Sequence, residues 1–304
     1  PCGDGRRSAR ERSNMQTTED SSAEEEKEFK REDMVWTRIY YGRDVMERII
    51  DTIDVKRALS QRFFLRYTLR AAMAGVIICL MYVLVYKIKT DLGPDFNPAL
   101  SKYLMGLNFS MALVFIYFTN SELLTSNFMY FTVGGYYDKV TWGDTIKIWG
   151  MCLIGNMLGI VLIAVLVWSC GMLSEDLVEN LVHTVNDKTV NSGAWLIFVK
   201  GMFANYFINV SVIVAMIVKE YFAKIVVLMM GVTVFAFMGY EHVVANSALF
   251  AMALLEQPES VNVLQIGKNF LFSFIGNYVG GGLAIGLFYA YLNDHRGDPS
   301  RQRV

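Results

Sequence analysis

Two short stretches of this chain place a glutamate five residues before an asparagine, in the middle of long uncharged sequence. Glu122 and Asn127 form the first pair, and Glu241 and Asn246 form the second, 119 residues further along. His242 follows the second glutamate directly. A carboxylate or an imidazole at membrane depth is costly and usually marks a functional site. Because histidine exchanges its proton near neutral pH, the second stretch predicts a site that handles protons or anions.

Thr125 lies in the break that is the counterpart of the one around His242. A hydroxyl both donates and accepts hydrogen bonds, so Thr125 could pass one between an anion and the imidazole. The simpler alternative is that His242 only packs within its break and that Thr125 bonds its own backbone. The residues alone leave both interpretations open.

The composition is that of a polytopic membrane protein. Of 304 residues, 54% are hydrophobic and only 19% are charged, which suits a chain surrounded by a lipid bilayer. The apolar sequence has no basic patch for nucleic acid, and it has no CxxC motif or Cys/His cluster for a metal. We therefore predict a membrane protein that is not an enzyme and that uses no nucleic acid, metal or cofactor.

Six uncharged or nearly uncharged runs are long enough to cross a bilayer as helices. Four are continuous, at about 68–87, 148–174, 194–218 and 269–293. The second run (103–119) and the fifth (225–240) each stop at a polar break and resume beyond it. Breaks at corresponding positions of two halves are typical of a transporter's site. Three spans per half predict an all-α polytopic membrane protein with an inverted 3+3 repeat and broken helices 2 and 5.

A second motif is repeated inside the apolar runs. Gly155-Asn156-x-x-Gly159 in the third run recurs as Gly276-Asn277-x-x-Gly280 in the sixth, 121 residues later. Small residues let helices approach closely, and an asparagine can hydrogen-bond across the contact. We interpret this motif as helix packing rather than chemistry.

Lysine and arginine gather on one side of the spans, whereas the opposite loops (89–102, 175–193 and 256–268) are richer in acidic residues. The positive-inside rule then places both termini in the cytoplasm, and we expect the chain in the cytoplasmic (inner) membrane. We expect five segments: a cloning-derived leader (1–14), a disordered cytoplasmic tail (15–43), an amphipathic helix (44–62), a transmembrane channel domain (63–293) and a cytoplasmic C-terminal tail (294–304).

Four motifs, in type and order, resemble the formate/nitrite transporter family: Asn120–Asn127, Ala204-Asn205, Gly239–Asn246 and Ile275–Gly280. The resemblance covers about residues 45–293. It implies an aquaporin-like six-helix protomer, assembled as a homopentamer in which each protomer has its own pore.

The resemblance also implies roles for individual residues. The central pore site falls on His242, facing Thr125, together with Asn205, Glu241 and Asn246. The cytoplasmic-side constriction falls on Leu113, Leu123 and Phe235, and the outer one on Phe109, Leu124 and Ile208. Close relatives carry phenylalanine at the position of Leu124. Lys188 falls in the outer vestibule.

Together these features predict a channel or transporter for small monovalent anions or their acids, with formate first and nitrite, hydrosulfide, acetate and lactate behind it. In the favoured mechanism a proton supplied at His242 neutralises the anion, because a bare carboxylate in an apolar constriction carries a large desolvation cost. Alternatively, positive potential from Lys188 and the half-helix N-termini stabilises the anion. Two other classes remain open: an aquaporin-type channel for water or neutral solutes, and a scaffold or receptor acting through the acidic tail.

Overall fold

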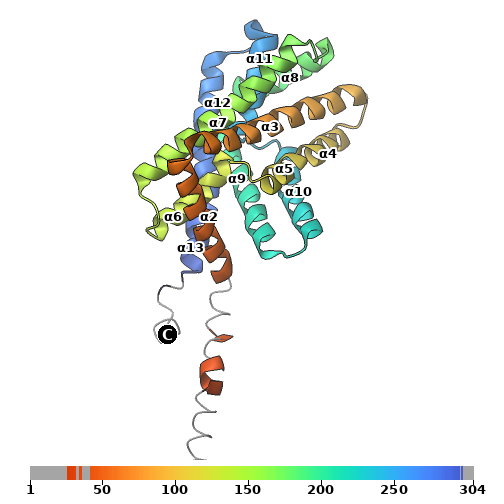
Figure 1. Ribbon diagram of the computed structural model, residues 1–304. Helices are drawn as coiled ribbons and strands as arrows, with labels where there is room; N and C mark the ends of the chain where they lie inside the picture. The colour runs from red at the N-terminus through yellow and green to blue at the C-terminus, as the bar shows by residue number, and fades with distance from the viewer. Residues whose placement is uncertain (1–25, 32–33, 36–41, 295, 297–304) are drawn as a thin grey trace, which may run out of the picture. The chain divides into compact units, whose positions relative to one another are not determined.

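The computed structural model describes residues 26–31, 34–35, 42–294 and 296 (Figure 1). The expected leader (1–14), most of the expected tail (15–43) and most of residues 294–304 lie outside the described residues. Within the tail, the described residues 26–31 are helical. The chain divides into two compact units, and the one that covers Val45–Ala290 is described below. Every regular element in the described ranges is a helix, so the prediction of an all-α protein is confirmed.

The long helices follow the predicted runs, with ends that differ from the predicted ones by a few residues. Three are continuous: α3 (Phe64–Leu92), α7 (Trp142–Ser169) and α9 (Ala194–Ile217). The second run divides at Ser110 into α4 (Pro98–Phe109) and α5 (Met111–Phe118). The sixth is α12 (Val263–Asn277), which passes into the π-helix η2 (Tyr278–Leu287) and then α13 (Phe288–Leu292). In the described part of the chain, five stretches are long and apolar enough to cross a membrane, with Pro98–Phe118 counted as one.

The two predicted breaks are present and are built alike. The first separates α5 from α6 (Leu124–Tyr136), and the second separates α10 (Tyr221–Phe237) from α11 (Val243–Glu256). Each break starts with a residue in the left-handed backbone region, Asn120 (φ 51°) and Gly239 (φ 64°), at equivalent positions of the two halves. Glycine and asparagine are the residues that adopt this conformation most readily. The turn that opens each break is therefore encoded locally.

One amphipathic helix precedes the first long helix of each half. The expected helix at 44–62 is α2 (Arg43–Arg62), with Met46, Ile49 and Ile53 buried. The expectation of an outer loop at 175–193 is wrong. Residues 175–189 form a second amphipathic helix, α8 (Glu175–Thr189), which buries an apolar face. Its apolar residues recur at helical spacing, but they stand among acidic residues that favoured the loop interpretation. A short 3-10 turn, η1 (Pro258–Ser260), follows α11.

The repeated glycine motif packs pairs of long helices at close range, as predicted. Helix α7 lies against α3, and α12 with η2 lies against α9 (Figure 1). A Cβ on Gly159 would fall 1.9 Å from the carbonyl oxygen of Ala72, and one on Gly280 would fall 1.9 Å from that of Met202. Because the obstacle is backbone in both cases, neither position has room for any side chain.

We expect Gly159→Ala to lower the thermal midpoint of the detergent-solubilised protein by several degrees, since overpacking typically costs about 1–3 kcal/mol. Gly150→Ala is the matched control in the same helix, because a Cβ there meets nothing within 4 Å. Alanine is the better helix former, so the control should unfold at the same temperature or higher. Equal midpoints for the two variants would show that α7 and α3 do not depend on this contact.

Candidate functional site

The second break is held by an asparagine from the neighbouring long helix. Asn277 Nδ2 donates hydrogen bonds to the carbonyl oxygens of Gly201 and Glu241, both at 2.8 Å. Its Oδ1 accepts from the backbone N–H of Val243 at 2.8 Å. One side chain therefore joins α12 to α9 and satisfies backbone groups on both sides of His242. Such groups need partners inside the protein because the bilayer core offers none.

The first break has the same support. Asn156 Nδ2 donates to the carbonyl oxygens of Ala71 and Glu122, both at 2.8 Å, and its Oδ1 accepts from Leu124 N–H at 3.1 Å. Asn156 and Asn277 are thus more than packing residues: each one fixes the shape of a break. The Gly-Asn motif contained this signal, because its repeat offset nearly equals that of the two breaks.

Behind the second break lies a buried cluster centred on Glu241. Lys188, in the last turn of α8, places its Nζ 3.1 Å from Glu241 Oε1. Asn246 Nδ2 donates to Glu241 Oε2 at 2.5 Å and to Asn269 Oδ1 at 3.0 Å. The Glu241 side chain is 1% exposed and that of Lys188 is 15% exposed. Asn246 thus belongs to this cluster, and Lys188 is an ion-pair partner rather than a solvated lysine.

The first break has a matching cluster that the sequence reasoning missed. Lys56 of α2 places its Nζ 2.5 Å from Glu122 Oε2, and Asn127 Nδ2 donates to the same oxygen at 3.2 Å. The Glu122 side chain is 4% exposed. Lys56 thus occupies in α2 the role that Lys188 has in α8. The only sequence signal was that each lysine lies in the segment preceding the first long helix of its half.

His242 and Thr125 meet between the two breaks, as predicted. The distance between Thr125 Oγ1 and His242 Nε2 is 2.9 Å, and both residues are buried. The backbone N–H of Ala245 donates to His242 Nδ1 at 3.1 Å, which makes His242 the N-cap of α11. Because Nδ1 accepts, the hydrogen-bond network assigns the neutral ring with its proton on Nε2, donated to Thr125.

Asn205 supports this pair from behind. Its Nδ2 donates to the carbonyl oxygen of Thr125 at 3.0 Å and to that of Asn277 at 2.8 Å. Asn209, one turn further along α9, also donates to the Thr125 carbonyl, at 3.4 Å. The predicted pore asparagine therefore positions the backbone beneath the threonine hydroxyl.

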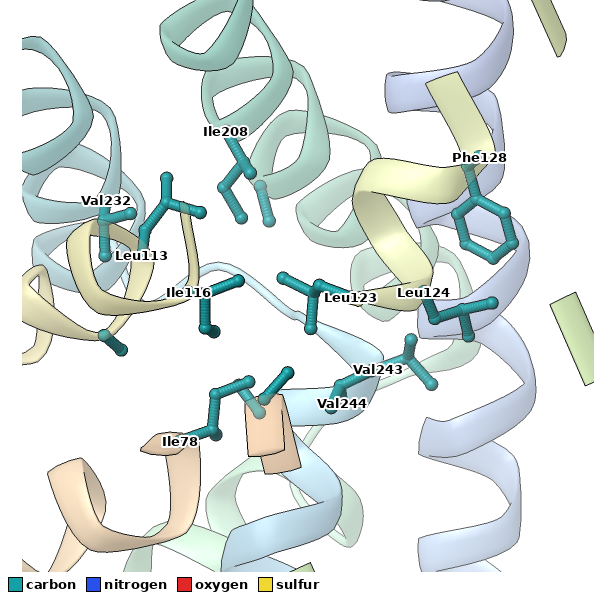
Figure 2. Close-up of a cluster of buried hydrophobic side chains, with 14 of the residues drawn as sticks. Ile78, Leu113, Ile116, Leu123, Leu124, Phe128, Ile208, Val232, Val243 and Val244 are labelled. Atoms are coloured by element: carbon teal, nitrogen blue, oxygen red, sulfur yellow. The ribbon is translucent and has the colours of Figure 1, made fainter. Parts of the chain in front are cut away.

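A small apolar cavity lies on the other side of His242. It measures about 20 Å³, enough for about one water molecule. Of the described side chains that line it, His242 is the only polar one; the others are Ile78, Phe109, Ala112, Leu113, Ile116, Leu123, Ile208, Val232, Phe235 and Ala245. Figure 2 shows Leu113, Ile116, Leu123 and Ile208 gathered around this space. We call it the inner cavity.

A second cavity, the α2 vestibule, is far larger and more polar. It measures about 480 Å³ and is lined by residues of α2, α3, α5, α6, α9 and α10 and of the first break. Leu113, Ile116 and Leu123 line both cavities and therefore separate them. A solute that passes between the two must cross this apolar constriction.

Five of the six expected constriction residues line the same inner cavity: Leu113, Leu123, Phe235, Phe109 and Ile208. Phe235 thus lies with Leu113 and Leu123, the residues with which it was expected; its ring also packs edge-on against Phe109, with centroids 6.1 Å apart, and it does not line the α2 vestibule. The reason is that α10 packs against α4, which brings the end of α10 level with Phe109. His242 lies beside the same ring, with a centroid distance of 6.0 Å.

Of the residues expected at the outer constriction, one lies elsewhere. Ile208 lines the inner cavity together with Phe109, and it is one helical turn from Val212, which lines the α2 vestibule. Leu124 is fully buried and lines neither of these cavities. Figure 2 shows it directed away from Leu123, toward Phe128. Successive side chains at the start of α6 point in different directions, so only Leu123 reaches the pore.

The fold and the site together define a membrane channel or transporter for small solutes: apolar helices enclose two broken ones, and one buried imidazole stands at an apolar constriction. Sequence comparison gives the family. Residues 43–291 match the model of the formate/nitrite transporter family, and the chain belongs to that family.

Individual relatives agree with this assignment. The nitrite transporter NirC of Escherichia coli (strain K12) is 29% identical over 238 residues, which are 77% of this chain and 86% of NirC. A solved FNT family ion channel superposes with a TM-score of 0.73 at 26% identity, covering 82% of this chain and 98% of that one. A pentameric formate channel solved with formate bound has the same fold, with a TM-score of 0.65, 23% identity, and coverage of 75% of this chain and 96% of that channel. The family resemblance and the aquaporin-like fold are confirmed. In this family the relatives are transporters and channels, not enzymes.

We expect Lys188→Met to destabilise the protein by about 3–5 kcal/mol, because it leaves the buried carboxylate of Glu241 without its cation. The double variant Lys188→Met/Glu241→Gln removes both charges and should recover much of that loss. Thermal unfolding in detergent measures both effects.

The exposed pair Lys87 and Asp91 provides the control, since both side chains are more than half exposed. Lys87→Met should cost less than about 1 kcal/mol. Additive losses in the double variant at Lys188 and Glu241 would contradict the coupling between these two residues.

Proposed function

We propose that the chain conducts small monovalent anions or their conjugate acids, formate first and nitrite second, past His242. The observation that carries this proposal is the inner cavity, where His242 is the one polar lining side chain among apolar neighbours. An anion entering such a space loses its water and finds a single hydrogen-bond donor. The desolvation cost therefore favours passage as the neutral acid, or with a proton shared in transit.

The pair of His242 and Thr125 suits this role. His242 Nε2 donates its proton to Thr125 Oγ1 at 2.9 Å. A substrate oxygen in the inner cavity can accept this hydrogen bond in place of Thr125 Oγ1, while the Ala245 N–H donated to Nδ1 keeps the ring in the required tautomer. Asn205 keeps the threonine backbone in position. In the proton-coupled mechanism the ring keeps its Nε2 proton and donates it in a hydrogen bond to the substrate, and the proton that neutralises the anion enters with it from the solution.

The alternative mechanism, attraction by Lys188, has less support. Its ammonium lies 3.1 Å from the carboxylate of Glu241, so the two charges largely cancel. Lys56 and Glu122 form the same kind of pair in the other half. Neither lysine contributes a free positive charge to the pore.

The relatives support the proposed substrates and assembly. NirC is named a nitrite transporter and the pentameric channel was solved with formate bound, so these two anions precede hydrosulfide, acetate and lactate. We also propose a homopentamer with one pore per protomer, in the cytoplasmic membrane with both termini in the cytoplasm. The α2 vestibule then opens to the cytoplasm, in line with the positive-inside rule. Membership of the family disfavours the water-channel and scaffold alternatives.

Flux into proteoliposomes tests the substrate class. We expect stopped-flow shrinkage and reswelling with formate and with nitrite, together with acidification of the lumen if a proton crosses with the anion. Protein-free liposomes give the background. Water permeation without any response to either anion would reject the proposal.

We expect His242→Phe to lower formate and nitrite flux at least tenfold, since a hydrogen bond to a charged group contributes about 1.5–3 kcal/mol. Thr125→Val leaves the imidazole in place and should reduce flux less while weakening its dependence on external pH. Both variants should elute as the same oligomer as the wild type, which separates loss of transport from loss of assembly. Wild-type flux in His242→Phe would remove the histidine from the pathway.

A further inference from the structure

The α2 vestibule carries more positive charge than the passage of a small monovalent anion requires. Among the residues that the structure describes, six charged side chains line it: the cations Arg48, Lys56, Arg70 and Lys224, and the carboxylates Asp51 and Glu122. Lys56 and Glu122 are 2.5 Å apart and neutralise each other. The remaining wall therefore holds three cations against one carboxylate.

The three remaining cations are available to a ligand. Arg48 donates to the carbonyl oxygen of Met216 at 2.5 Å, a contact that leaves its charge in place. In the described part of the chain, Arg70 and Lys224 have no carboxylate within ion-pair distance. Lys224 Nζ lies 5.8 Å from the ring centroid of Tyr221, a contact that leaves its charge in place. A cavity of this kind raises the local concentration of anions.

The inner cavity is too small and too apolar for a large, multiply charged anion to pass from the α2 vestibule. The vestibule measures about 480 Å³, whereas the inner cavity measures about 20 Å³. Leu113, Ile116 and Leu123 stand between them. An anion with two or more charges cannot shed its water to cross these apolar side chains.

We propose that the α2 vestibule binds a multiply charged phosphorylated anion, which the apolar constriction retains there and which thereby blocks transport. Guanidinium groups match the oxygens of a phosphate in geometry and charge, and the hydroxyls of Thr52, Ser121 and Ser126 line the same wall. The phosphate belongs either to a soluble metabolite or to a lipid headgroup. The blocking effect rests on the proposed transport function, whereas the binding does not.

Calorimetric titration of the full chain in phosphatidylcholine nanodiscs with inorganic pyrophosphate tests the binding. We expect saturable binding that Lys224→Gln weakens about fivefold and that Asp51→Asn strengthens by a similar factor. Lys219→Gln is the matched control, because this exposed lysine near the start of α10 does not line the vestibule. No binding, or equal effects of Lys224→Gln and Lys219→Gln, would overturn the proposal.

A second arm identifies the source of the phosphate. If the native ligand is a lipid, phosphatidylglycerol in the nanodiscs should compete with pyrophosphate; if it is soluble, adenosine monophosphate should compete and the lipid should not.

In proteoliposomes, pyrophosphate on the vestibule side should inhibit formate flux at constant ionic strength, and pyrophosphate on the opposite side should not. If pyrophosphate binds with the expected effects of Lys224→Gln and Asp51→Asn but the protein transports neither formate nor nitrite, the binding site is supported and the transport proposal is rejected. Normal transport that pyrophosphate leaves unaffected would reject the block.

Discussion

An interrupted helix inside a membrane must find partners for its free backbone groups within the protein, and both breaks of this chain depend on that requirement. Asn156 and Asn277 meet it with the same three hydrogen bonds in each half. They reach the opposite backbone because the flanking glycines bring the helices close together. The glycine contacts and the asparagine bonds are thus one device, which positions Thr125 and His242 rather than acting on a solute.

Charge balance is the second condition for a working pore in this fold. A buried glutamate without a partner would be strongly destabilising, and a lysine cancels it in each half. The lysines of these two pairs belong to the amphipathic helices α2 and α8, so both helices are part of the channel framework. Because the pairs are neutral, the imidazole of His242 stands as the polar element of an otherwise apolar cavity. The vestibule at one end retains its own uncancelled cations.

Much of the fold and part of the site could be predicted before the structure was known. The apolar runs, the polar interruptions and their repetition at a constant offset all appear in the sequence, and they indicate an inverted repeat with a site at its centre. The contact between Thr125 and His242 followed from the family resemblance, and the structure contains it at 2.9 Å. Two other assignments were displaced: Asn246 bonds Glu241 instead of sharing the pore with His242, and Leu124 lines neither cavity.

The sequence by itself determined what depends on near neighbours. It fixed which residues form long helices and where Asn120 and Gly239 turn the backbone. It also placed glycines at the positions where two helices come into contact. Tertiary structure decided what depends on distant ones. Lys56 and Lys188 find their carboxylates 66 and 53 residues away, and α8 becomes a helix whose apolar face has a surface to cover. Helical spacing gives the face of a side chain relative to its own helix, but the direction of the pore is set by how the helices pack around it.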